Sequence, residues 1–188
     1  QRIKEERYSF KDEDLRQHFP LSKVISGLFE LLNRLYSISV SEEPAETWDP
    51  SVRLFSVNNQ EGELIGYFYA DLFARDGKRP GAWMDDAIGR WKTDQHVQLP
   101  VAYLVCNFPS PSGHSGDAFL SHSEVETLFH ECGQVMHHLM TQIDEIGISG
   151  INGVEWDAVE LPSQFMENFC WDWDIVSKIS TDTSGEGH

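Results

Sequence analysis

The stretch LFHECGQVMHHL, residues 128–139, places a histidine directly before a glutamate. The motif H-E-x-x-H binds zinc through two histidines one helical turn apart and uses the glutamate as a base. Here His130 and Glu131 open the motif, but its fifth position is Gln134. The stretch could therefore belong to a zinc enzyme, to a zinc enzyme that has lost a ligand, or to a helix that resembles one by chance.

A hydrolytic zinc site needs three protein ligands and an open position for water. Ligands at i and i+4 of one helix converge, and the third must come from elsewhere. Glu160 is the natural candidate, because it lies downstream at the start of a segment that returns to helical spacing. Glu131 would take a proton from the metal-bound water and pass it to the leaving amine. Gln134 offers only an amide oxygen, a poor substitute for imidazole at zinc.

Two long segments carry a resemblance. LFHECGQVMHHLMTQ and SGINGVEWDAVELPSQFMENFCW resemble the active-site region of the oligopeptidase A and thimet oligopeptidase family of zinc metallopeptidases, and the likeness continues upstream through YFYADLFAR, KRPGAWMDD and PVAYLVCNF. It implies one Zn²⁺, with His130 and Glu160 as ligands and Glu131 as base. Where the family has its second histidine and a phenylalanine, this chain has Gln134 and Cys132.

The resemblance also implies that parts are missing. Family members are several times longer, hydrolyse internal bonds of short peptides and enclose a channel, whereas residues 1–188 match only a single catalytic-core region. The expected partners are short peptides and the family's N- and C-terminal parts, of which the latter carries a histidine-tyrosine segment that polarises the substrate carbonyl. We expect an endopeptidase that is impaired by Gln134 and by truncation. The alternative is an inactive remnant that at most binds peptides.

Other polar residues near the motif have two interpretations each. His137 and His138 lie about 10–12 Å beyond His130 along a helix that rises 1.5 Å per residue, too far to share one metal readily. We expect His138, together with Gly150 and Gly153 of a glycine-rich loop, to face the substrate; a plain surface loop is the alternative. Glu167 is expected either to orient a metal ligand through a hydrogen bond or to be an ordinary solvated helix residue.

The surrounding pattern predicts an α+β fold, mostly α-helical with a small antiparallel β-sheet, and the resemblance implies a zincin-like catalytic core. Strand-forming runs at 52–57, 64–73 and 100–108 predict a sheet within 52–108, in which the first two form a hairpin. Apolar residues at steps of three and four predict the motif helix at 123–144, with a capping box formed by Ser123 and Glu126. A further helix is expected at 159–175, beginning beside the third ligand.

Composition excludes several classes of partner. The chain has 31 acidic and 14 basic residues, a formal net charge of −17, whereas nucleic acids and anionic membrane surfaces bind basic patches. No apolar run approaches the roughly 18–20 residues of a membrane span. Cys106, Cys132 and Cys170 form no paired spacing, which favours free thiols in the cytoplasm or an organelle interior over a secreted protein.

Overall fold

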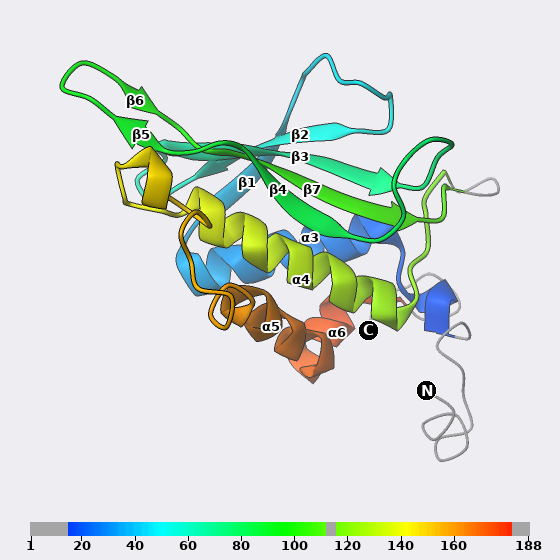
Figure 1. The fold of residues 1–188 in the computed structure, drawn as a ribbon. Coiled ribbons are helices and arrows are strands. Elements are labelled where there is room, and N and C mark those ends of the chain that lie inside the picture. Colours follow the sequence, from blue (N-terminus) through cyan, green and yellow to red (C-terminus); the bar gives the residue numbers. More distant parts are fainter. Residues whose placement is uncertain (1–14, 112–115, 182–188) are drawn as a thin grey trace.

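The computed structural model describes residues 15–111 and 116–181, in which helices cover one face of a β-sheet (Figure 1). The elements follow in the order η1 (Arg16–His18), α3 (Leu21–Tyr36), β1 (Ser39–Glu43), β2 (Arg53–Asn58), β3 (Leu64–Phe73), β4 (Trp83–Ile88), β5 (Trp91–Lys92), β6 (Val97–Gln98), β7 (Val101–Phe108), α4 (His122–Leu139), η2 (Ile146–Ile148), α5 (Leu161–Glu167), η3 (Asn168–Trp171) and α6 (Trp173–Ile179). The α+β class predicted from the sequence is confirmed. None of the helices in these two ranges is long and apolar enough to cross a membrane.

The main sheet has five strands in the order β1-β2-β3-β7-β4, and β5 with β6 forms a separate two-stranded hairpin. The expected β2–β3 hairpin is present and antiparallel. The sheet, expected to be antiparallel, is mixed, because β3 and β7 run parallel, with Tyr67 opposite Val101. The intervening β4 and the β5–β6 hairpin carry the chain back to the end of the sheet where β3 begins, so β7 starts beside the start of β3 (Figure 1).

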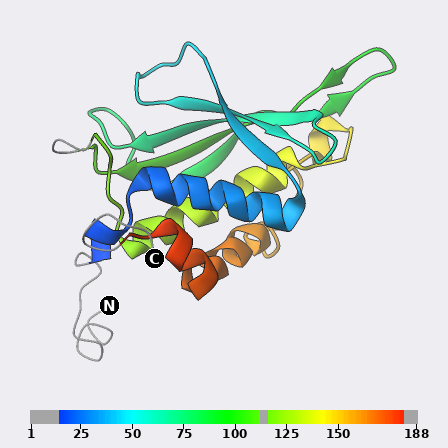
Figure 2. The same ribbon diagram turned by 180° about the vertical axis from the view of Figure 1, so that it is seen from behind.

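The core lies between the sheet and helices α3 and α4. Alternate residues of β3 and β7 point toward the helices, as the two-residue period of a strand requires. Figure 2 shows α3 and α6 from behind, where α6 packs against α3. The buried side chains of this layer include Phe55, Phe68, Ala70, Leu72, Ala102, Leu104, Leu28, Leu31, Leu32, Val125, Leu128, Phe129 and Val135.

Helix α4 begins and ends earlier than predicted. The capping box is formed by Ser121 and Glu124, two residues before the expected pair, and the Glu124 carboxylate also binds Arg16 at 2.6 Å. The helix ends at Leu139 instead of 144. Beyond it, Asp144 accepts a hydrogen bond from Arg90 Nε at 2.8 Å, so the chain after the helix is held by the neighbouring strand region instead of continuing the helical ladder.

The sequence predicts one helix at 159–175, but the structure has three short helices there, α5, η3 and α6. Asp172 ends the middle turn and caps α6 by accepting a hydrogen bond from the Asp174 backbone at 2.9 Å. Where α5 crosses α4, Gly133 allows the two backbones to touch. A Cβ at Gly133 would lie 2.6 Å from Pro162 O and 2.7 Å from Ser163 Cα, closer than such atoms ever approach. This crossing brings the first turn of α5 beside the motif residues of α4.

Candidate active site

His130 lies between two carboxylates from opposite ends of α5. Its Nδ1 is 2.5 Å from Glu167 Oε1 and its Nε2 is 3.1 Å from Glu160 Oε2. A carboxylate that holds the Nδ1 proton turns the Nε2 lone pair toward Glu160, which is the ring orientation that a metal ligand needs. Two electron-rich atoms at such a separation are stable only with a proton or a cation between them. The geometry therefore suits a cation at this point.

Gln134 and Ser163 approach the same carboxylate. Gln134 Nε2 donates to Glu160 Oε2 at 2.8 Å, and Ser163 Oγ donates to that oxygen at 2.9 Å. Sequence spacing and the resemblance proposed His130, Gln134 and Glu160 for one site, and the structure places the three side chains in contact. The sequence did not single out Ser163 as a site residue. The sequence signal that could have identified Ser163 is its position three residues after Glu160 at a helix start. Its hydroxyl also binds the Glu160 backbone carbonyl at 2.8 Å.

Glu131 is almost fully buried, with 6% of its surface exposed, and its Oε2 has no hydrogen-bond partner among the described residues. The pKa of Glu131 is raised to about 7, chiefly by burial and also by the nearby Glu160 carboxylate, while His130 and a hydrogen bond from the Met84 backbone oppose the rise. A pocket of about 390 Å³ adjoins this carboxylate and is lined by Ala82, Ser123, Glu126, Thr127, His130, Glu131 and Glu167. A carboxyl group of this pKa can both accept and release a proton near neutral pH.

His138 does not occupy the substrate-facing position that the sequence suggested. Its side chain has no exposed surface, and its Nε2 donates to Ile88 O at 2.9 Å. A ring enclosed in this way has no face to offer a peptide. Gly150 does line a second pocket, of about 410 Å³, together with His137, and Gly153 is exposed in the same loop.

The donor set determines which metal ion the site fits. No group of three histidine, cysteine, aspartate or glutamate side chains arranged for a metal occurs within 15–111 and 116–181. His130 and Glu160 are two good zinc ligands. The third position is held by the Gln134 amide, which would present its oxygen to a cation only after a half-turn of the amide group. The residues thus fit a divalent cation with two strong ligands and one weak one.

Known proteins match the sequence of this chain. The model of peptidase family M3 matches residues 1–187. Oligopeptidase A of Haemophilus influenzae is 52% identical over 179 residues, which cover 94% of this chain and 26% of that protein. Oligopeptidase A of Escherichia coli is 50% identical over the same shares, and the organellar oligopeptidase A, chloroplastic/mitochondrial, of Arabidopsis thaliana is 42% identical over 96% of this chain and 24% of its own length.

The chain spans about a quarter of the length of the curated relatives that it matches. The resemblance inferred from the motifs is confirmed. This chain belongs to peptidase family M3.

Proposed function

We propose that this chain carries the catalytic centre of a zinc-dependent endopeptidase that hydrolyses internal bonds of short peptides. The observation that carries the proposal is the approach of His130 Nε2 to Glu160 Oε2 at 3.1 Å, beside the buried carboxylate of Glu131. Two ligand types known for zinc thus lie together, beside a pocket that His130 shares with a base of suitable pKa.

His130 and Glu160 would hold the metal, and Gln134 would occupy the third, weak position. When bound, zinc polarises the scissile carbonyl and lowers the pKa of a coordinated water toward neutrality. Glu167 fixes the His130 ring through its contact with Nδ1 at 2.5 Å. Such supporting carboxylates keep an imidazole in the tautomer and orientation required for ligation.

Glu131 accepts a proton from the attacking water and delivers it to the amine of the departing peptide fragment. Its pKa of about 7 supports both halves of this exchange, because neither protonation state is strongly disfavoured at neutral pH. The backbone N–H of Met84 contacts the carboxyl group. That contact ties the base to strand β4.

A second candidate is a metal-free remnant that only binds peptides. It is favoured by the orientation of Gln134, whose amide donates a hydrogen bond to Glu160 where a metal ligand would offer a lone pair. The Glu160 carboxylate then accepts its hydrogen bonds from Gln134 and Ser163 and needs no metal. The two candidates differ in metal content and not in fold.

The proposed partners are short peptides and the remaining parts of the longer family protein. Strong net negative charge, −17, argues against nucleic acids and anionic membranes. For location we propose a reducing compartment, the cytoplasm or an organelle interior. Support comes from three cysteines that are buried and free, and from relatives named as cytosolic and as chloroplastic/mitochondrial.

Zinc content and peptide turnover, measured on the same purified chain, test the proposal. Elemental analysis gives zinc per chain, and a quenched-fluorescence peptide gives turnover before and after chelation. We expect less than one zinc per chain and slow turnover that chelation removes and added zinc restores. Peptide binding without zinc uptake or turnover would favour the remnant, and turnover that resists chelation would contradict a metallopeptidase.

A further inference from the structure

The loop between α4 and α5 is fastened to the end of strand β4. Asn152 Nδ2 donates to Asp86 Oδ2 at 3.1 Å and to Ser149 O at 3.2 Å, and Ser149 is fully buried. Two glycines of this loop have left-handed backbones, Gly150 with φ +66° and Gly153 with φ +76°. The loop therefore has a defined path along β4, although its sequence is rich in glycine.

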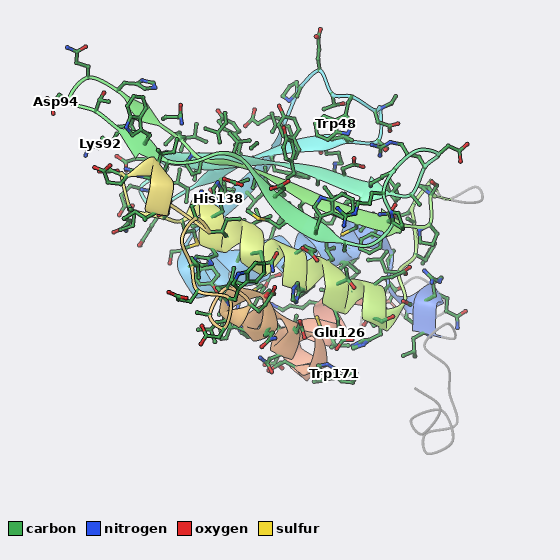
Figure 3. The ribbon with its side chains drawn as sticks, in the orientation of Figure 1. Trp48, Lys92, Asp94, Glu126, His138 and Trp171 are labelled. Carbon is green, nitrogen blue, oxygen red and sulfur yellow. The ribbon has the colours of Figure 1, made fainter. Side chains whose placement is uncertain are left out.

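His138 lies beneath this loop, near the C-terminal end of α4 (Figure 3). Because the Ile88 carbonyl can only accept a hydrogen bond, the proton of the neutral ring is on Nε2, and Nδ1 carries a lone pair. That Nδ1 is buried and has no hydrogen-bond partner among the described residues. A Cβ at Gly150 would lie 2.3 Å from Nδ1. The backbone of Gly150 thus rests directly on the imidazole edge.

From these contacts we infer that His138 is a positioning residue for the loop 147–153, holding it in register with the end of β4. Nε2 fixes the ring to the strand, and the opposite edge of the ring sets how closely Gly150 can approach. The same strand contacts the catalytic base through Met84. A single buried ring therefore links the loop to the element that supports Glu131.

The loop forms part of a pocket that a peptide could use. Gly150 and Ile148 line the pocket of about 410 Å³, which also includes Gly133 and Pro162 at the crossing of α4 and α5. Because Gln134 and Glu160 belong to the same crossing, a shift of the loop would reshape the space next to the candidate metal site. The inferred role of His138 in peptide binding rests on the proposed function, whereas its role in loop position does not.

Two alanine substitutions in one loop isolate the contact with the ring. Gly150→Ala and Gly153→Ala share the cost of a left-handed alanine. Only the first also collides with His138, since a Cβ at Gly153 meets its nearest atom, Ile148 Cγ2, at an ordinary 3.5 Å. Hydrogen–deuterium exchange of the loop amides reports the local opening, and the melting temperature reports global stability. We expect Gly150→Ala to accelerate loop exchange about tenfold more than Gly153→Ala does.

Removing the ring should relieve that collision. The double variant His138→Ala/Gly150→Ala is expected to exchange more slowly in the loop than the sum of its single variants predicts, which is the signature of a direct contact. Equal effects of the two alanine substitutions, or additive effects in the double variant, would overturn the inference.

The hydrogen bond to Ile88 is tested by a matched pair of variants at His138. Glutamine can place an N–H near the position of Nε2, whereas leucine fills similar space without a donor. His138→Gln should keep loop exchange near that of the parent chain, and His138→Leu should raise it roughly tenfold, the expected effect of one lost buried hydrogen bond. Identical exchange in the two variants would contradict a positioning role and leave His138 as packing alone.

Peptide affinity separates this inference from the proposed function. A fluorescein-labelled peptide of about six residues with one bulky apolar side chain serves as the probe, because methionine, isoleucine and proline side chains are among those that line the pocket. We expect Gly150→Ala and His138→Leu to weaken its binding, and Gly153→Ala and His138→Gln to leave it nearly unchanged. Unchanged affinity in all four variants would refute the part of the inference that concerns peptide binding. Absence of binding by the parent chain would count against the proposed function, while loop exchange would still decide the position of the loop.

Discussion

At the scale of single residues, the proposed chemistry has two requirements. Glu131 serves proton transfer, and Gln134 occupies a metal-binding position, so variants at the two residues test the requirements separately. Glu131 faces the pocket and does not lie among the groups around Glu160 Oε2. In a Gln134→His background, Glu131→Gln should lower peptide turnover by about 10²–10⁴-fold, the usual share of a general base. Zinc per chain and the melting temperature should remain near those of the background variant.

The control for this variant is Glu145→Gln, the same chemical change at an exposed position outside the pocket. It should leave turnover unchanged. Turnover that survives Glu131→Gln would show that another group is the base or that a contaminating peptidase is being measured.

The sequence could propose candidate site residues where ligation imposes residue type and spacing. His130 and Glu131 lie in one contiguous motif, and Glu160, further along the chain, is proposed from helical spacing and from the resemblance. The role of His138 was not predictable, because its side chain is defined by what packs around it, namely Ile88 O and Gly150, which are distant in sequence. A histidine on a polar helix face looks the same in sequence whether it meets solvent or a buried carbonyl.

At the scale of the elements, the contact of α4 with α5 positions the whole site, and Gly133 permits it. Gly133→Ala should destabilise the chain by about 1–3 kcal/mol, the usual cost of overpacking, because its Cβ would collide with the backbone of Pro162 and Ser163. Urea unfolding followed by circular dichroism measures the change. Gly147→Ala, where a Cβ meets nothing within 4 Å, is the matched control and should change stability little. Equal stability of both variants would mean that α5 is free to shift away from α4.

The end of β3 depends on an ion-pair network around Asp71, whose side chain is 6% exposed. Burial by itself raises the pKa of Asp71, but hydrogen bonds from Arg75, Lys78 and Trp48 together lower it to about 2. Since the folded-state pKa lies below the unfolded value, this stabilisation is present above pH 4 and is lost as pH falls toward 2.

Asp71→Asn should therefore destabilise the chain at pH 7 by about 1–2 kcal/mol, with a difference that shrinks as pH falls from about 4 to 2. Urea unfolding of both proteins across this range measures it. The control is Asp76→Asn, because Asp76 follows β3 but lies outside the Asp71 network. A difference that is independent of pH would show that the Asp71 charge is not what stabilises the network.

The hydrophobic pattern of the sequence predicted those elements that depend on residues close together in the chain. The β2–β3 hairpin and the apolar stripe of α4 up to Leu139 follow from periods of two and 3.6 residues. The parallel pairing of β3 with β7 and the early end of α4 depend on contacts between distant segments, such as Arg90 with Asp144. The break between η3 and α6 falls where Asp172 caps α6, a local signal that the helical spacing around it obscured.

At the scale of the whole molecule, strong negative charge coexists with exposed aromatic surface. Large apolar side chains are exposed between 156 and 173, among them Trp156 at 93%, Leu161 at 71% and Trp173 at 71%. Exposed apolar surface favours association, which a net charge of −17 opposes at low ionic strength. Salt near 1 M shortens the Debye length to about 3 Å and should therefore increase self-association.

Sedimentation velocity at low and high salt tests this balance. The double variant Leu161→Ser/Trp173→Ser should remain monomeric at high salt, whereas Val97→Ser, which removes an exposed apolar side chain of β6, should associate like the parent chain. A parent chain that stays monomeric at high salt would show that this surface does not drive association.

If the site is a metallopeptidase centre, Gln134 is the residue that weakens its metal binding. Equilibrium zinc titration of the parent chain and of Gln134→His, in competition with a chromophoric chelator, tests it most directly. We expect close to one zinc per chain for Gln134→His and an affinity at least about 10–100-fold above that of the parent, since replacing a ligand should matter more than altering the groups around it. Equal zinc affinity in the two proteins, whether tight or absent, would contradict it.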